Sequence, residues 1–334
     1  MITDYKHNFS SHCETGVTSG LLRHKGLDIS EPMAMGIGSG IFFTYLPFIK
    51  AQDAPMVSFR TAPTKVFKLT TQRLGVKTVV VRKFKNQLEA MDILDRNLKN
   101  GIPTGCQVGC YHLTYLPPEM HVHYNFHNVV VFGKEDGIYH VAEPVLEDTQ
   151  ILTYEDLLRV RFAKGLFEPK GKMYYVESVT PDPDIKKAIF AGIKTSVKNM
   201  IKDPVPLLGV RGMRMLGRDI KKWPKKHPAK KAAFNLIQLV RTVEEFGTGG
   251  AAFRFIYGSF LKEAGEKLNH DILLETSIEM GETGNLWREF SIRSGRFVKT
   301  RNGSQDDYSL LADIILECAE RERKIFNKLD KISK

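Results

Sequence analysis

The clearest candidate for a nucleophile is Cys13, which lies in the stretch FSSHCETGVTSGLLRHKG at residues 9–26. Ser11 and Glu14 have the spacing of a capping box, and apolar residues then recur at helical spacing until Gly26. The stretch therefore predicts one short helix with Cys13 in its first turn, where the helix dipole favours the reactive thiolate. An inert, buried thiol on a helix gives the same pattern, so the assignment depends on a partner base.

A base and a group that orients it are predicted about a hundred residues further on, in HNVVVFGKEDGIYHVAEP at 127–144. Two β-branched and aromatic runs flank a turn near KEDG, which predicts an antiparallel hairpin. The start of the first strand then lies opposite the end of the second, so His127 and Glu143 are expected side by side. With Cys13 they supply the nucleophile, base and orienting group that covalent catalysis by cysteine requires.

The elements that must position these residues fall into two regions. Before the prolines of TPDPD at 180–184, β-branched runs and one well-marked helix predict a mixed α+β region. The predicted strands lie within 77–84, 101–113, 127–144 and 171–179, and the helix lies at 86–101. Beyond the prolines, 3.6-residue apolar periodicity predicts helices at 183–203, 232–247, 250–268, 270–297 and 309–332. We therefore expect one domain at 1–179 and an all-α domain at 180–334.

The composition is that of an ordinary globular protein, with 334 residues of which 42% are apolar. The cysteines are too few for a disulfide framework, so reduced thiols are expected at Cys13, Cys106, Cys110 and Cys318. The first residues lack the apolar core of a signal peptide, which predicts a cytoplasmic location. The apolar run at 32–49 is short and contains glycines and a proline, so no membrane span is expected.

The net charge of +11 is concentrated beyond residue 180, where 29 Lys and Arg residues against 20 Asp and Glu residues give +9. The densest basic segment is 218–233. Such a segment suits nucleic acid, anionic lipid or an acidic protein. No nucleic-acid-binding motif lies nearby, so we expect no nucleic acid partner. Two interpretations stay open: a solvated connector between helices, and a docking surface for an acidic protein through Lys221, Lys222, Lys225 and Lys226.

The sequence contains partial motifs for two other kinds of site. His121 and His123 would share one face of a strand, as a pair of metal ligands does, but no second ligand cluster completes the site, so no metal is expected. Gly36, Gly38 and Gly40 imitate half of a dinucleotide-binding fingerprint, but no strand precedes them and no suitable acidic residue follows. Close packing beneath the Cys13 helix is the expected role of these glycines.

The order of these motifs carries a family resemblance. A cysteine on an N-terminal helix, then GIPTGCQV, a histidine strand and an acid-proline strand resemble the papain-like peptidases that trim bacteriocin leaders. Those enzymes usually have aspartate before the proline and glutamine six positions before the cysteine, where this chain has Glu143 and His7. The pieces HCET, ISEPMAMGIGSGIFFTY, HNVVVFG, AEP and GTGGAAFRFIYGSFLKEAG resemble more closely the family of butirosin biosynthesis protein H with its C-terminal companion domain.

This resemblance implies a papain-like α+β domain followed by an all-α domain, and acyl transfer as the activity. An acyl group would pass from an acyl carrier protein thioester to Cys13 and then to an amine, with His127 as base and Glu143 as its orienting group. No bound cofactor is implied, because the phosphopantetheine arm belongs to the donor. The implied partners are an acidic acyl carrier protein and a small amine acceptor.

Three further residues are candidates for substrate binding. Glu31 is either a helix cap or a group that points into the cleft, and the resemblance favours the cleft. Arg254 and Tyr257 follow GTGG on a predicted helix, where they are either core residues or part of an anion site for the phosphopantetheine arm.

Two rival functions use the same residues. One is a cysteine peptidase or amidase with water as the acceptor, which differs from a transferase in how the cleft excludes water. The other is a non-catalytic binding protein on the same scaffold, for which Glu143 in place of aspartate is the main support.

Overall fold

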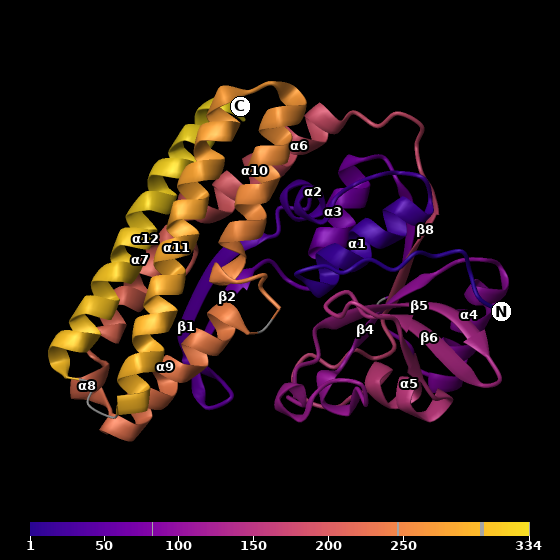
Figure 1. Cartoon of the computed structure of the whole chain (residues 1–334), viewed down its shortest axis with the longest axis horizontal. Helices are drawn as coiled ribbons and strands as arrows, with labels where there is room; N and C mark the ends of the chain where they lie inside the picture. Colours follow the sequence, from indigo (N-terminus) through magenta and orange to yellow (C-terminus); the bar gives the residue numbers. More distant parts are fainter. Residues whose placement is uncertain (82, 246, 301–303, 334) are drawn as a thin grey trace. The chain divides into compact units, whose positions relative to one another are not determined.

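The computed structural model describes four stretches of the chain, residues 1–81, 83–245, 247–300 and 304–333. The chain forms two compact units (Figure 1). The first unit consists of Met1–Ala34 and Val66–Asp184, and the second consists of Met35–Lys65 and Ile185–Lys334.

The first unit is built on a six-stranded antiparallel sheet with the strand order β3-β8-β4-β5-β6-β7. Its strands are β3 (Lys77–Val81), β4 (Thr104–Val108), β5 (His127–Glu135), β6 (Ile138–Ala142), β7 (Gln150–Leu152) and β8 (Met173–Ser178). Strand β5 is buried from His127 to Gly133, as expected of an apolar run covered on both faces. Asp136 and Gly137 both have positive φ in the two-residue turn between β5 and β6, so the predicted hairpin is confirmed.

The helices of this part of the chain are α1 (Cys13–His24), α2 (Glu31–Ile37), α3 (Lys65–Arg73), α4 (Gln87–Lys99) and α5 (Tyr154–Arg161). The first unit ends within α2, at Ala34. Two short 3-10 turns, η1 (Cys110–His112) and η2 (Pro118–Met120), lie between β4 and β5. Helix α1 packs against β5, β4 and β8. Asn86 caps α4 by accepting the N–H of Leu88, and the apolar face of α4 joins the core beside β5. The helix predicted at 86–101 is therefore confirmed.

The second unit combines a β-hairpin with the C-terminal helices. Strands β1 (Ile41–Ala51) and β2 (Ala54–Arg60) pair antiparallel and pack against α7 and α9. The helical elements are α6 (Ile185–Val197), a π-helical turn η3 (Lys198–Lys202), α7 (Gly209–Ile220), α8 (Trp223–Lys226), α9 (Ala229–Glu244), a 3-10 turn η4 (Ala251–Phe253), α10 (Arg254–Leu268), α11 (Asp271–Thr300) and α12 (Gln305–Ile332). Figure 1 shows α11 beside both α10 and α12, in agreement with their contacts.

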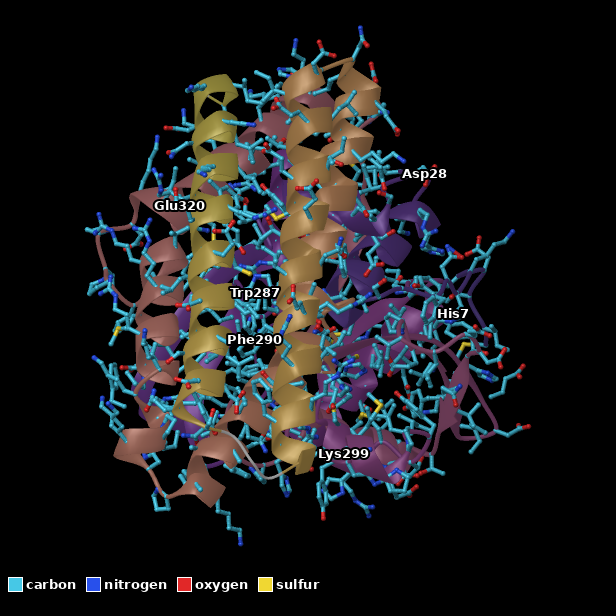
Figure 2. The ribbon with its side chains drawn as sticks, turned by 60° about the vertical axis from the view of Figure 1, so that its left-hand side comes forward. His7, Asp28, Trp287, Phe290, Lys299 and Glu320 are labelled. Atoms are coloured by element: carbon cyan, nitrogen blue, oxygen red, sulfur yellow. The ribbon has the colours of Figure 1, made fainter. Side chains whose placement is uncertain are left out.

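Aromatic side chains form much of the core of the second unit. Figure 2 shows Trp287 and Phe290 on α11, where both are fully buried. The ring of Phe59 on β2 packs edge-on to Trp287, with 5.2 Å between the ring centroids. The hairpin therefore contributes directly to the core of the helical unit.

The predicted fold class is confirmed, because an N-terminal α+β region with an antiparallel sheet precedes a helical C-terminal part. The compact units differ from the predicted limits of 1–179 and 180–334 in two ways: their later boundary follows Asp184, and the segment 35–65 packs with the C-terminal helices. A Cβ on Gly192 of α6 would lie 2.4 Å from the carbonyl oxygen of Gly36, so the two backbones are in direct contact. A Cβ on Gly36 would also meet the ring of Phe260, so Gly36 packs within the second unit and not beneath the Cys13 helix.

Other predicted elements have mixed outcomes. The basic segment 218–233 is largely helical, because it spans the end of α7, all of α8 and the start of α9. Helix α7 itself was not among the predicted helices. Residues 82 and 246, which fall within predicted elements, lie outside the described residues. None of the helices in the described ranges combines the length and apolar character needed to cross a bilayer.

Candidate active site

The site is centred on Cys13, the first residue of α1, whose side chain is buried with 6% of its surface exposed. His12 is the N-cap of the helix, and the predicted capping box of Ser11 and Glu14 is wrong. Glu14 instead turns inward and accepts the N–H groups of Val66 and Phe67 at the start of α3. Its carboxylate thus fixes α1 against the positive end of a second helix.

Gly16 on α1 allows the loop after β6 to approach the helix closely. A Cβ on Gly16 would lie 2.8 Å from the Cβ of Pro144, a distance that real Cβ atoms do not tolerate. The N–H of Ser10 donates to the carbonyl of Pro144 at 2.6 Å, which joins the same loop to the residues before α1. The fold therefore holds Glu143, the residue before Pro144, close to the start of α1.

His127 and Glu143 meet as the hairpin predicts. Nε2 of His127 lies 2.9 Å and 2.7 Å from the two carboxylate oxygens of Glu143, and both side chains are buried. The hydroxyl of Tyr115 donates to Oε2 of Glu143 at 2.9 Å. The sulfur of Cys13 also interacts electrostatically with His127 and raises the pKa of the imidazole. Because Nε2 faces the carboxylate, Nδ1 is the ring nitrogen left for the thiol.

The electrostatic environment separates Cys13 from an ordinary thiol. Burial raises the pKa of Cys13, but the interactions of the sulfur with His12 and His127 outweigh it and hold this pKa well below its ordinary value. Burial lowers the pKa of His127, but Glu143 and the sulfur of Cys13 hold it well above its ordinary value. The two groups therefore favour a thiolate beside an imidazolium, the charge state of an activated cysteine nucleophile.

The three other cysteines have the opposite character. Burial raises the pKa of Cys106 and Cys318 and raises that of Cys110 to about 11. All four cysteines are buried and reduced. His127 also acts on Cys110, but there burial prevails, whereas at Cys13 the interactions with His12 and His127 outweigh burial.

A second chain of hydrogen bonds approaches the nucleophile through His12, a residue that the sequence does not predict as part of the site. Nδ1 of His12 lies 2.9 Å from the hydroxyl oxygen of Thr15, and that hydroxyl donates to Oε1 of Glu31 at 2.9 Å. The N–H of Thr15 also lies 3.4 Å from Nδ1. A carboxylate only accepts, so the hydroxyl of Thr15 donates to Glu31.

The carboxylate of Glu31 binds the backbone in front of α1. Its carboxylate accepts the N–H groups of Ser11 and His12 at 2.9 Å and 2.7 Å. With the hydroxyl of Thr15, these bonds use both carboxylate oxygens. Glu31 therefore holds the backbone that leads into Cys13. For His12, the sequence gives one signal, which is its position beside the cysteine.

The other predicted binding residues are part of the helical core. Arg254 is fully buried, and its Nε and one terminal nitrogen donate to the two oxygens of Glu322 at 2.9 Å and 2.8 Å. Trp287 donates its indole N–H to the same carboxylate, and Tyr257 is also fully buried. Of the two roles predicted for them, Arg254 and Tyr257 have that of core residues, because both are fully buried and the guanidinium pairs with a buried carboxylate.

Three other histidines, His7, His121 and His123, contact carbonyl oxygens or an aromatic ring. His7, labelled in Figure 2, has Nε2 at 2.9 Å from the carbonyl oxygen of Leu146. His121 contacts the carbonyl of Leu113, and the ring of His123 stacks on Tyr111 with 4.1 Å between centroids. Among the described residues, no three His, Cys, Asp or Glu side chains form a group that could hold a metal ion.

The sequence of this chain matches two families of known proteins. Residues 12–144 match the family described as butirosin biosynthesis protein H, N-terminal. Residues 155–329, more than half of the chain, match the family described as a domain of unknown function, DUF4872. No curated protein sequence matches the chain.

Among solved structures, the chain is similar to a protein from Bacillus anthracis described as a C39-like peptidase, with 15% identity and a TM-score of 0.35. The similarity covers 54% of this chain and 98% of the other. The two family matches follow one another along the chain in the order that the motifs predicted, and the first contains Cys13, His127 and Glu143. The chain therefore belongs to the family that joins the N-terminal domain of butirosin biosynthesis protein H to the domain DUF4872.

Proposed function

We propose that this protein is a cysteine-dependent acyltransferase that moves an acyl group from a thioester to an amine through a Cys13 acyl-enzyme. The observation that supports it best is the buried chain from Cys13 through His127 to Glu143. Membership of a family described by a biosynthesis protein favours transfer to a product over degradation.

In the first half of the proposed reaction, the thiolate of Cys13 attacks the carbonyl carbon of the donor thioester. The oxyanion that forms would be stabilised by backbone N–H groups at the start of α1, which have no carbonyl acceptor within the helix. Such donors commonly contribute about 3 kcal/mol each. The intermediate then expels the donor thiolate, which takes the proton of the His127 imidazolium and leaves as a thiol.

In the second half, the amine attacks the acyl-thioester on Cys13, and neutral His127 accepts the proton that the amine loses. Collapse of this intermediate breaks the bond to sulfur, releases the amide and restores the thiolate and imidazolium. Glu143 keeps Nε2 of His127 engaged throughout, so that Nδ1 faces the sulfur. No bound cofactor takes part in these steps, and the donor is proposed to be a phosphopantetheine thioester.

An acidic acyl carrier protein is the proposed source of that thioester. Lys221, Lys222, Lys225 and Lys226 are exposed at the end of α7 and on α8, which suits an acidic partner. Cytoplasmic function is part of the same proposal.

The test is intact mass spectrometry of the wild type and Cys13→Ala after exposure to a panel of acyl thioesters. We expect the wild type alone to gain the acyl mass and to lose it faster in a primary amine than in water. The same adduct on Cys13→Ala would disprove the assignment of the nucleophile.

A peptidase or amidase with the same residues is the second candidate. It would be favoured if no thioester gave an adduct while peptides or simple amides were cleaved in a reaction that needs Cys13.

A further inference from the structure

A buried amide lies against the proposed nucleophile. Asn128 follows His127 on β5, and its side chain is fully buried. Its Nδ2 lies 3.8 Å from the sulfur of Cys13, within the range of an N–H···S hydrogen bond. Neither the family descriptions nor the proposed mechanism gives this residue a role.

The orientation of the amide follows from its neighbours. Nδ2 donates to the carbonyl of Phe126 at 2.8 Å, and a carbonyl only accepts, so the nitrogen end of the side chain is fixed. An amide nitrogen carries two hydrogens, and the second is available to Cys13. At the other end, Oδ1 accepts a hydrogen bond of 2.9 Å from the hydroxyl of Tyr174 on β8. The amide is therefore held at both ends by groups outside the catalytic chain.

The charges of the site explain why such a donor is useful. The imidazolium of His127 is shared between the thiolate of Cys13 and the carboxylate of Glu143, so these three groups together carry one net negative charge in a buried site. A buried anion is costly unless it accepts hydrogen bonds. A neutral amide supplies one to the sulfur without adding a further charge that needs compensation.

We propose that Asn128 is a positioning residue that donates an N–H to the Cys13 thiolate, and that the Tyr174 hydroxyl holds the amide in place. The inference rests on the proposed role of Cys13 as nucleophile. It concerns the protonation of the Cys13 sulfur and not the identity of the acyl donor, so it is testable without a substrate.

The experiment measures the rate at which iodoacetamide alkylates Cys13 in the full-length protein as a function of pH, with the modified residue identified by mass. The variants are Asn128→Ala, which removes the donor, and Tyr174→Phe, which removes only the hydroxyl that holds it. Asn125→Ala is the matched control, because Asn125 is another buried amide whose nitrogen donates to the carbonyls of Lys164 and Leu166. Circular dichroism verifies that each variant is folded.

We expect Asn128→Ala to raise the pH midpoint of alkylation by about one unit, which is about a tenfold lower rate on the acidic side of the profile. Tyr174→Phe should shift the midpoint the same way by about a third to a half of a unit, and Asn125→Ala should leave it in place. A structural role alone would change stability without moving the midpoint.

Unchanged midpoints in folded Asn128→Ala and Tyr174→Phe would overturn the inference and leave the proposed function intact. If Asn128→Ala does not fold, Tyr174→Phe decides alone. A wild-type Cys13 with an ordinary thiol midpoint would overturn both the inference and the proposed nucleophile.

Discussion

At the scale of single residues, the environment of Cys13 lowers the pKa of its thiol, a property that the residue type alone does not give. Four cysteines are buried in this chain, and burial alone raises a thiol pKa, as it does for Cys106 and Cys318. Cys13 departs from them because its interactions with two histidines lower its pKa, and each histidine is connected to a carboxylate. The first chain is direct, from His127 to Glu143, and the second passes through the hydroxyl of Thr15.

The role of Glu143 can be separated into its charge and its hydrogen-bond acceptor. Glu143→Gln keeps an acceptor for Nε2 of His127 but loses the charge, so we expect about a tenfold slower acylation, against about 10²- to 10³-fold for Glu143→Ala. The carboxylate raises the pKa of His127, so in Glu143→Gln the imidazolium should lose its proton at lower pH. The alkaline limb of the pH-rate profile should therefore move to lower pH.

The measurement is the pH dependence of acyl-adduct formation in wild type and both variants. Tyr115→Phe is a useful control, because it removes one hydrogen bond to the carboxylate and keeps the charge. Equal losses in Glu143→Gln and Glu143→Ala would show that an acceptor at this position does not orient the base.

At the scale of elements, buried charges join helices whose sequences are far apart. Glu14 connects α1 to the N-terminus of α3, although its spacing from Ser11 suggested a local cap. Arg254, at the start of α10, pairs with Glu322 of α12 and lies beside Trp287 of α11. Both carboxylates are fully buried, so their partners on other helices are required for stability and not optional.

The pair of Arg254 and Glu322 provides a stability test. Arg254→Met leaves a buried carboxylate without its cation, and we expect a loss of about 3–5 kcal/mol in the free energy of unfolding. Adding Glu322→Leu should recover most of this loss, because an apolar pair of similar volume avoids the desolvation cost. The measurement is chemical denaturation of the full chain.

The matched control is Arg293→Met, which breaks a partly exposed pair with Glu289 one turn away on α11. An exposed helical pair of this kind contributes about 0.3–0.5 kcal/mol. If Arg254→Met lowered the free energy of unfolding no more than Arg293→Met does, the buried pair would not stabilise the helical unit.

At the scale of the whole molecule, the two compact units do not follow the order of the sequence. The segment 35–65 leaves the N-terminal region and supplies a hairpin to the helical unit. The apolar side chains of Phe43 and Phe59 are buried there, with the ring of Phe59 against Trp287. The helical unit is therefore completed by residues that precede most of the sheet.

This arrangement predicts how fragments behave. Residues 180–334 alone lack the hairpin, so we expect them to bind a dye for exposed apolar surface and to unfold without a cooperative transition. Residues 35–65 joined by a long Gly/Ser linker to 185–334 restore the missing contacts and should unfold cooperatively. Circular dichroism during thermal unfolding measures the difference.

A second control is the linked fragment with Phe59→Ala, where loss of a buried aromatic ring should cost about 3–5 kcal/mol. If residues 180–334 were as stable as the linked fragment, the hairpin would not belong to the core of that unit.

The amino-acid sequence by itself determined the local elements and the candidate chemistry. The run HNVVVFGKEDGIYHVAEP specified its own hairpin, because a two-residue Asp-Gly turn and β-branched flanks fix the register and so bring His127 to Glu143. The long apolar periodicities of α11 and α12 likewise predicted helices, since a 3.6-residue repeat over many turns has no other compact solution. Helix α7 was missed because its glycines weaken helix propensity, and their close packing becomes visible only in three dimensions.

Only the tertiary structure decided which polar residues act together. Glu31, Thr15 and His12 form one chain because the loop before α1 folds back on α2, and no spacing rule predicts that contact. Asn128 reaches Cys13 across 115 residues of sequence for the same reason. Arg254 lies at a helix N-terminus, which is typical of an anion site. The packing of α12 brings Glu322 to it as its partner. Periodicity and turn chemistry are local properties of the chain, whereas the partner of a buried charge is set by the packing of distant elements.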